Sequence, residues 1–557
     1  MEQLSQLIAA VVQELYGEHT TVVLTRPDEQ FGDYATNVAL QLSKKVGKNP
    51  REIAGEIVAK LIDDSIVKTE VAGPGFINIT LTDSALIALT YAETSKSLMG
   101  KEILVEYSDP NPFKPLHAGH LYTTLVGDTI ARLIENAGAI THRINYGGDV
   151  GRHVGISMWS ILQYLGGENP DKLQEITDKP KWLGERYVAG TAAFEEDVTA
   201  KKEILEVNRR VYELHEKQDH ESNFAKIYWT CREWSYAYFA ELYLQLHVTP
   251  FERYIPESEV TPLALQTVRE QLQKGVFSVS DGAVIFEGEK YGLHTRVFIN
   301  SQGLPTYETK DVGLSLTKWR DYHFDRSIII TANEQEQYMR VVIKSIEQFE
   351  PEAAKRTTHI THGFVKLMGG VKMSSRKGNT VTALEILDAA RVAGAKSDAK
   401  PNEDTILSAV KYAFAKNRIG GDIEYNSRES IALEGNSGPY LQYAHARARS
   451  ILRKSKVESE KSKAFDFKLL TLDSGERTLV RKLGMYAETV DLATAELMPH
   501  HICTYLYELA QTFNRFYEHN KVLDNPREAI RLQLVSQYAV TLSSGLGLLG
   551  INAPEQM

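Results

Sequence analysis

The segment from Ile103 to Gly138 constrains the fold most, because a short apolar run is followed by a loop and a long helical repeat. The run ILVEY (103–107) predicts a strand, and apolar residues recur at helical spacing after His120. The sequence ITHRINYGG (140–148) then predicts a second strand. Such β-α-β units imply a parallel sheet with a ligand crevice at the carboxyl ends of its strands.

The rest of the chain divides by pattern into four parts, since 557 residues are too many for one core. Residues 1–98 predict a small α+β domain, in which Asn49, Pro50 and Glu52 form a capping box before a helix and 76–81 form a strand. Residues 99–380 predict the parallel-sheet domain, with a helical insertion at about 168–250, after which strands return with GAVIFEG (282–288), TRVFIN (295–300) and SIIIT (327–331). Residues 381–436 predict a connecting helical segment that opens with a Thr382 and Glu385 capping box, and 437–557 predict a helical bundle.

Composition excludes several classes of protein. No run of about 18 apolar residues occurs, so we expect no membrane-spanning helix, and the two cysteines, far apart in the sequence, favour a reducing cytosol. A net charge of −10 argues against indiscriminate nucleic-acid binding but allows a local basic surface. We expect no metal site and no structural zinc, because the cysteines and scattered histidines lack ligand spacing: Cys231, Cys503, His142, His153, His215 and His247.

Two histidines stand at the predicted start of the helix, in His117-Ala118-Gly119-His120. At this spacing both imidazoles can point to one side, beside unpaired backbone N–H groups that favour an anion. Gly119 would let a ligand approach the backbone closely. The pair could therefore bind phosphate oxygens and stabilise charge that develops on them. The alternative is a pair of structural, capped histidines.

A lysine-rich loop, KMSSRKG (372–378), is the second candidate. Its three cations, two hydroxyls and glycine suit a polyphosphate whose charge moves during a reaction. By itself such a loop is more often a solvated surface segment. Together with the histidine pair, it favours a nucleotide site.

These motifs resemble those of one enzyme family. HAGH is similar to the HIGH signature of class I aminoacyl-tRNA synthetases, and KMSS matches their second signature. The segments VEYSDPNPFKPLHAGHL, YETKD, ANEQEQY and NSGPYLQYAHARARSIL resemble arginyl-tRNA synthetases, as do FGDYATNVA, VAGPGFINI and the terminal LGLLGINAPEQM. The resemblance runs from about residue 30 to the last residue.

The resemblance implies a Rossmann-like α/β catalytic core, a small α+β N-terminal domain and an all-α anticodon-binding bundle. It implies that arginine is activated with ATP to arginyl-adenylate, with release of pyrophosphate, and then transferred to tRNA(Arg). Mg²⁺ would arrive with ATP. Catalytic roles would belong to His117, His120, Lys114 and Lys372, and ATP would also contact Gly119, Met373, Ser374 and Ser375.

Arginine carries a planar, permanently charged guanidinium that requires carboxylates in fixed geometry. The resemblance places Glu106 and Asp311 opposite this group, with Tyr307 one helical turn before Asp311. Asn111 and Gln335 would hold the α-amino and carboxylate ends. Outside the family context, the preferred interpretations are a core tyrosine for Tyr307 and a helix N-terminal charge for Asp311.

The basic stretch near residue 450 is the visible part of a tRNA surface. Arginine side chains there could hold phosphates and two preceding tyrosines could stack on unpaired bases: Tyr440, Tyr443, Arg447, Arg449 and Arg453. The alternative is a solvated basic helix with core tyrosines. The resemblance further implies a monomer, a cytoplasmic location and a tRNA-elbow contact by the N-terminal domain.

Three other functions remain as alternatives. Another class I synthetase would need zinc ligands for cysteine, which this chain lacks, or cations opposite a glutamate side chain. A catalytically silent paralogue would not need Lys114, His117, His120 and Lys372 together. A small-molecule nucleotidyltransferase would not explain the helical C-terminal region.

Overall fold

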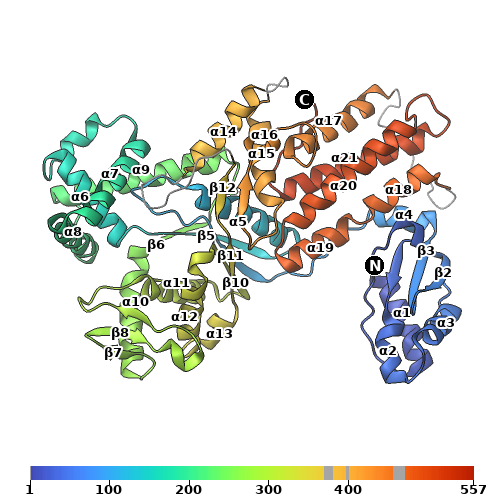
Figure 1. Cartoon of the computed structure of the whole chain (residues 1–557), viewed down its shortest axis with the longest axis horizontal. Coiled ribbons are helices and arrows are strands. Elements are labelled where there is room, and N and C mark those ends of the chain that lie inside the picture. Colours follow the sequence, from blue (N-terminus) through green and yellow to red (C-terminus); the bar gives the residue numbers. More distant parts are fainter. Residues whose placement is uncertain (1, 369–380, 397–400, 456–470) are drawn as a thin grey trace.

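The protein is described here from a computed structural model, which places residues 2–368, 381–396, 401–455 and 471–557. Figure 1 shows a central α/β body, with a helical insertion at one end and the C-terminal helices at the other. The N-terminal domain lies below the C-terminal helices in this view and contacts α18.

Five parallel strands form the central sheet in the order β11-β10-β4-β5-β6. They are β4 (Glu102–Glu106), β5 (Ile140–Gly147), β6 (Arg253–Pro256), β10 (Arg326–Ala332) and β11 (Thr357–His362). The predicted strands ILVEY and ITHRINYGG are confirmed as the neighbours β4 and β5. Strands β5 and β6 lie on one side of β4 in the sheet, and β10 and β11 lie on the other. The strand order therefore reverses between β4 and β10, and such sheets bind ligands in the crevice beyond this point.

Helix α5 (Ala118–Asn136) packs against this sheet and is buried over most of its length. Its apolar residues share a core with α14 (Ala383–Ala395) and α15 (Glu403–Ala415). Gly127 permits the close approach to β4, because a Cβ there would lie 2.3 Å from the Tyr107 ring. The helix ends before Gly138, whose φ of 93° suits a residue without a side chain.

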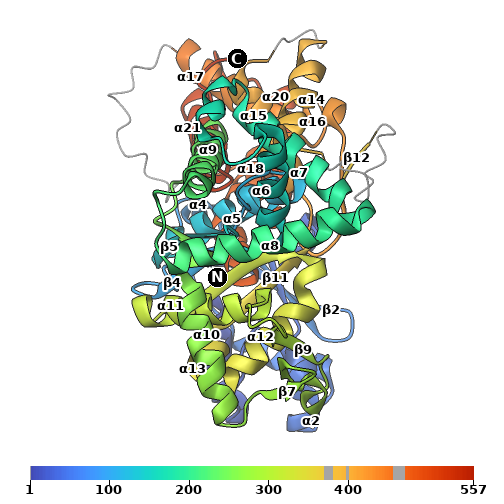
Figure 2. The same ribbon diagram turned by 90° about the vertical axis from the view of Figure 1, so that its left-hand side faces the viewer.

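The chain between β5 and β6, where the sequence predicts a helical insertion at about 168–250, contains helices from Arg152 to Gln245. They are α6 (Arg152–Leu165), a short 3-10 helix η2 (Pro170–Glu175), α7 (Lys179–Glu196), α8 (Val198–Glu216) and α9 (Asn223–Gln245). These helices have a core of their own, in which Val154, Met158 and Val211 are fully buried. In Figures 1 and 2 they lie above helices α10 and α11.

A second, antiparallel sheet stands beside the central one, with strand order β7-β8-β9. It contains β7 (Ser278–Ser280), β8 (Ala283–Phe286) and β9 (Arg296–Ile299), followed by α11 (Tyr307–Tyr322); η3 (Gly288–Tyr291) lies between β8 and β9. The predicted strands GAVIFEG and TRVFIN therefore form this small sheet, and only SIIIT joins the parallel sheet, as β10. Around it lie α10 (Glu257–Gln273), η4 (Asn333–Gln335), α12 (Glu336–Glu347) and α13 (Pro351–Lys355).

The N-terminal domain is α+β, as predicted. Its antiparallel sheet has the order β1-β3-β2, from β1 (Tyr34–Thr36), β2 (Ile66–Ala72) and β3 (Phe76–Leu81). Its helices are α1 (Glu2–Tyr16), η1 (Glu29–Phe31), α2 (Val38–Val46), α3 (Pro50–Lys60) and α4 (Asp83–Thr90). Asn49 caps α3 by accepting a bond from Arg51 N, but Glu52, exposed to competing water, does not complete the predicted capping box.

The C-terminal region is helical, as predicted, and residues 381–396, 401–455 and 471–557 contain one strand besides the helices. Strand β13 (Ile423–Tyr425) lies within the segment 381–436 and pairs in parallel with β12 (Val365–Leu367). The capping box of Thr382 and Glu385 is formed as predicted. The helices that follow are α16 (Ser427–Ser430), α17 (Gly438–Lys454), α18 (Ser474–Leu483), α19 (Tyr486–Glu496), α20 (His500–His519) and α21 (Glu528–Leu548).

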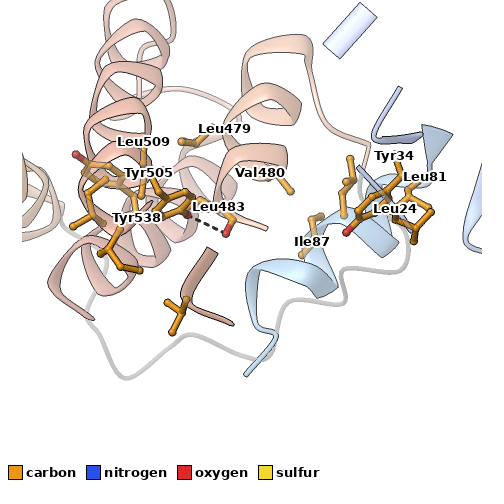
Figure 3. Close-up of a cluster of buried hydrophobic side chains, with 14 of the residues drawn as sticks. Leu24, Tyr34, Leu81, Ile87, Leu479, Val480, Leu483, Tyr505, Leu509 and Tyr538 are labelled. Carbon is orange, nitrogen blue, oxygen red and sulfur yellow. Dashed lines mark hydrogen bonds between the residues drawn. The ribbon is translucent and has the colours of Figure 1, made fainter. Parts of the chain in front are cut away.

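The N-terminal domain shares a core with the C-terminal helices. Figure 3 shows Leu24, Tyr34, Leu81 and Ile87 on one side and Leu479, Val480 and Leu483 of α18 on the other. Polar contacts surround this core: Arg477 donates to Asp33 at 2.7 Å and to Asp83, and Arg26 pairs with Glu488 at 2.8 Å. The two ends of the chain are therefore joined by a buried interface.

Candidate active site

A cavity of about 540 Å³ lies at the carboxyl ends of β4, β5, β10 and β11, where the β-α-β pattern predicts a ligand crevice. The structure brings together eight of the predicted site residues in its wall: Glu106, Asn111, His117, Gly119, His120, Tyr307, Asp311 and Gln335. Of the other predicted residues, Lys114 lies beside this wall. Lys372, Met373, Ser374 and Ser375 lie outside the described residues.

His117 and His120 hold each other in place at the start of α5. The Nδ1 atom of His117 accepts bonds from Gly119 N at 3.1 Å and His120 N at 3.3 Å, and His120 Nδ1 accepts a longer bond from His117 N at 3.4 Å. The two rings stack, with centroids 3.7 Å apart. A Cβ on Gly119 would lie 3.0 Å from the His117 ring, so glycine allows this ring to fold back over the helix.

This arrangement fixes the protonation of both imidazoles. Because Nδ1 accepts in each ring, the neutral ring carries its proton on Nε2. Burial lowers the pKa of His117 to about 3, helped by the charge of Lys114, and burial also places the pKa of His120 well below its ordinary value. The pair is therefore both a helix cap and, at neutral pH, a pair of uncharged Nε2–H donors.

Lys114 lies on the loop before the histidines, under the insertion. Its ammonium is 5.2 Å from the ring centroid of Tyr187 in α7, and a Cβ on Gly184 of the same helix would lie 3.2 Å from Pro115. Lys114 forms no ion pair with any residue that the structure places. Burial lowers the pKa of Lys114 to about 8. A bound anion would stabilise the protonated form of this side chain.

The opposite part of the cavity is acidic. Glu106 forms a buried ion pair with Lys318 of α11, and Glu257, the first residue of α10, forms one with Lys310. Asp311 has neither a hydrogen bond nor an ion pair within the described ranges. Burial raises the pKa of Asp311 well above its ordinary value, and the carboxylates of Glu106 and Glu257 raise it further.

Asp109 is a fourth acid in this wall. Its Oδ1 accepts a bond from Tyr146 N at 2.8 Å, and burial raises its pKa, with Glu106 as the second cause. The carboxylates of Glu106, Asp109, Glu257 and Asp311 therefore lie near only two lysines within the described ranges, Lys310 and Lys318, and the cavity wall further includes Arg296, Glu308 and Glu334. Such a site is short of positive charge and suits a cationic ligand.

The remaining predicted residues lie around these two parts. Tyr307 begins α11 and is half exposed, with the Lys310 ammonium 4.4 Å from its ring centroid. Asn111 packs against Gly148, where a Cβ would lie 2.2 Å from the amide oxygen of Asn111. Gln335 ends η4 and is exposed at the rim of the cavity.

The predicted tRNA surface lies on α17, remote in the fold from this cavity. Tyr440 accepts a bond from Asn514 at 2.9 Å, and Arg447 lies over the Tyr517 ring, so both pack against α20. Arg449 and Arg453 bind Glu555 of the terminal segment, at 2.7 Å and 3.7 Å. Tyr443 is about half exposed. These contacts give four of the five residues a structural partner, and their binding of tRNA stays a prediction.

Sequence reasoning missed several residues of the cavity. Tyr146 could have been found, because it stands at the carboxyl end of a predicted strand. Glu257 follows β6 and His362 ends β11, strands whose sequences RYIP and TTHITH are too short or too polar to be predicted as buried strands. The wall also includes Ser108, Asp109, Thr123, Gly148, Arg296, Glu308, Ile329, Ile330, Thr331, Ala332, Glu334, Tyr338 and Met339.

No three His, Cys, Asp or Glu side chains among the described residues are placed to hold one metal ion. None of the helices in the same ranges has both the length and the apolar character needed to cross a membrane.

Three family models match the chain in sequence order. They are the arginyl-tRNA synthetase N-terminal domain at residues 2–81, the catalytic domain of class I tRNA synthetases (R) at 83–427, and the DALR anticodon-binding domain at 441–557. The predicted domain boundaries stay predictions.

Two relatives and one solved structure are similar over nearly the whole chain. An arginine–tRNA ligase of Thermobifida fusca is 32% identical, with 95% of this chain and 94% of that protein covered. One from Lactobacillus delbrueckii is 31% identical over 99% of both chains. The solved structure of Thermus thermophilus arginyl-tRNA synthetase is 25% identical, covers 100% of both chains and has a TM-score of 0.81.

Proposed function

The chain belongs to the class I arginyl-tRNA synthetase family, and from this premise we propose that it joins L-arginine to tRNA(Arg) at the expense of ATP. One observation carries the proposal. Asp311 is a half-buried carboxylate without a partner in the described ranges, and it faces a cavity whose opposite part holds the histidine pair. A cationic amino acid and a nucleotide thus fit the two parts of one cavity.

The acidic part would bind arginine. A guanidinium offers five N–H donors in one plane, which suits Asp311 together with Glu106. Lys318 already pairs with Glu106, so Asp311 is the acid that gains most from the substrate's charge. Tyr307, one turn before Asp311, would contact the aliphatic stem, and Asn111 and Gln335 would bind the α-amino and carboxylate ends.

The histidine part would bind ATP. The neutral Nε2–H groups of His117 and His120 can donate hydrogen bonds to phosphate oxygens. Lys114 would add one cation, and Lys372 would add another, with Met373, Ser374 and Ser375 next to it in the sequence. Mg²⁺ would enter with ATP and be held mostly by its phosphates.

Two displacements would follow. In the first, an oxygen of the arginine carboxylate attacks the α-phosphorus, and the bond to pyrophosphate breaks, which leaves arginyl-adenylate. The donors on His117 and His120 would stabilise charge on the phosphate oxygens, and Lys114 and Lys372 charge on the pyrophosphate. In the second, a hydroxyl of the terminal ribose of tRNA attacks the arginyl carbonyl, and AMP leaves.

The tRNA would contact regions outside the cavity. By the family relationship, we infer that the helices after residue 437 bind the anticodon and that the N-terminal domain contacts the tRNA elbow. The shared core of these two regions would hold them in a fixed relation. A cytoplasmic location and a monomeric state are further inferences from the family.

The test is ATP–pyrophosphate exchange with each standard amino acid, run with and without tRNA. We expect exchange with arginine and not with citrulline, which has the shape of arginine but no side-chain charge. Exchange with cysteine or glutamate would replace arginine by the substrate of another class I enzyme. Binding of tRNA without any exchange would instead favour a silent paralogue.

A further inference from the structure

A third histidine lies at the same edge of the sheet as His117 and His120. His362 is the last residue of β11, opposite Ala332 of β10, and its side chain lines the cavity while only 2% of the residue is exposed. It is close enough to the histidine pair for its charged form to lower the pKa of both. Its ring packs on Tyr122 of α5, with centroids 4.5 Å apart.

The hydrogen bond of His362 determines which ring nitrogen carries the proton. Its Nδ1 lies 2.7 Å from the carbonyl oxygen of Gly363. A carbonyl can only accept, so Nδ1 must donate, and in the neutral ring Nε2 is then an acceptor. Burial lowers the pKa of His362, which favours this neutral form at pH 7.

His362 is therefore the chemical opposite of its two neighbours. His117 and His120 accept at Nδ1 and can donate from Nε2 to phosphate oxygens. The Nε2 atom of neutral His362 cannot donate, and it has no hydrogen-bond partner among the residues that the structure places. A ligand that satisfies it must offer an N–H or O–H group.

We propose, on the basis of the function proposed above, that His362 binds the nucleoside part of ATP by accepting a hydrogen bond at Nε2. The unprotonated phosphates of ATP have no donors, whereas its 6-amino group and ribose hydroxyls do. Arginine also has donors, but the acids that suit them lie in the other part of the cavity, around Asp311. His362 would thus read the nucleoside, beside two histidines that contact the phosphates.

The experiment compares the full-length protein with its His362→Phe and His362→Gln variants. Arginine-dependent exchange is measured in the presence of tRNA with ATP, with the analogue that lacks the 6-amino group, and with 2′-deoxy and 3′-deoxy ATP. We expect His362→Phe to raise the KM for ATP about 3- to 10-fold, the loss typical of one hydrogen bond, with the arginine KM unchanged. Glutamine can place an oxygen near the position of Nε2, so His362→Gln should recover part of this loss.

The analogues identify the donor. For the analogue that lacks the group bound by His362, wild type and His362→Phe should have the same KM, while the other analogues keep the difference. Tyr122→Phe is the matched control, because it removes a hydroxyl that has no hydrogen-bond partner among the residues described and keeps the ring against His362. It should leave the KM for ATP unchanged.

Three results would overturn the proposal. They are an unchanged KM for ATP in His362→Phe, an equal rise for ATP and every analogue, and a rise in the KM for arginine alone. Direct binding of ATP and the analogues, measured by calorimetry on the same proteins, does not depend on the amino acid. It therefore still tests His362 if arginine fails to support exchange and the proposed function is wrong.

Discussion

Replacing Asp311 by asparagine should weaken arginine use and at the same time stabilise the free protein. The first effect follows because the amide cannot form a charge-assisted bond with a guanidinium. Such a bond contributes about 1.5–3 kcal/mol, which corresponds to a fall of about 10- to 150-fold in kcat/KM for arginine. Glu106 remains in the cavity, so we expect reduced activity and not its complete loss.

The gain in stability has a separate cause. Without arginine, Asp311 is a carboxylate that lacks a partner in the described ranges, and burial raises its pKa well above the ordinary value. An amide of the same shape removes this buried charge, for which we expect a gain of about 1–2 kcal/mol in the free energy of unfolding. Because the raised pKa penalises the folded wild type as the pH rises through it, the gain should be small near pH 4 and complete above the raised pKa.

The assay is thermal unfolding of both proteins without ligands at pH 5 and pH 8, beside arginine-dependent exchange. Asp321→Asn is the matched control on the same helix, because Asp321 pairs with Arg253 at 2.7 Å and with Arg320 at 2.7 Å, and the bond from Arg320 lowers its pKa. This variant should lose a little stability and keep its arginine kinetics. Unchanged arginine kinetics in Asp311→Asn would remove Asp311 from the binding pocket, and a lower thermal midpoint would refute the unpaired-charge argument.

Three further substitutions test other parts of the account. The kcat/KM for ATP should fall above about pH 8, where Lys114 loses its proton in the free enzyme. In Lys114→Arg, kcat/KM should stay level to higher pH. A pH profile equal to that of the wild type would assign the fall to another group. His120→Ala should lower kcat about 10²- to 10³-fold, as measured by single-turnover exchange, whereas an effect on KM alone would indicate uniform ATP binding. Arg477→Ala removes donors to Asp33 and Asp83, so proteolysis should release the N-terminal domain faster. Charging of tRNA should fall, while calorimetry should still show ATP binding. An unchanged rate of proteolysis would mean that the apolar core is sufficient to hold the interface.

Much of the fold could be predicted because local patterns and tertiary structure agree. ILVEY, the helical repeat after His120 and ITHRINYGG have the apolar spacing of buried elements, and they form β4, α5 and β5. The capping box at Thr382 and Glu385 is likewise a local signal that the structure retains. The pairing of GAVIFEG and TRVFIN in a separate antiparallel sheet depends on long-range contacts, which no local pattern contains.

The candidate site divides in the same way. His117 and His120 could be found because they stand in a short motif at the start of a helix that follows a strand, a position that favours anion binding. Glu257 follows the four-residue strand RYIP and His362 ends the six-residue strand TTHITH, and the burial of both strands comes from neighbouring strands and helices and not from their own pattern. The contacts of Arg449 and Arg453 with Glu555 also could not be predicted, because Glu555 is more than a hundred residues away in the sequence.

The most direct test of the account is ATP-dependent charging of unfractionated tRNA, one standard amino acid at a time, followed by sequencing of the charged tRNA. We predict that arginine alone is attached, and only to arginine-accepting tRNAs. Charging with a different amino acid would keep the fold and contradict the assignment of Asp311 and Glu106 to the substrate. Bound tRNA without any charging would contradict the catalytic role of the histidine pair.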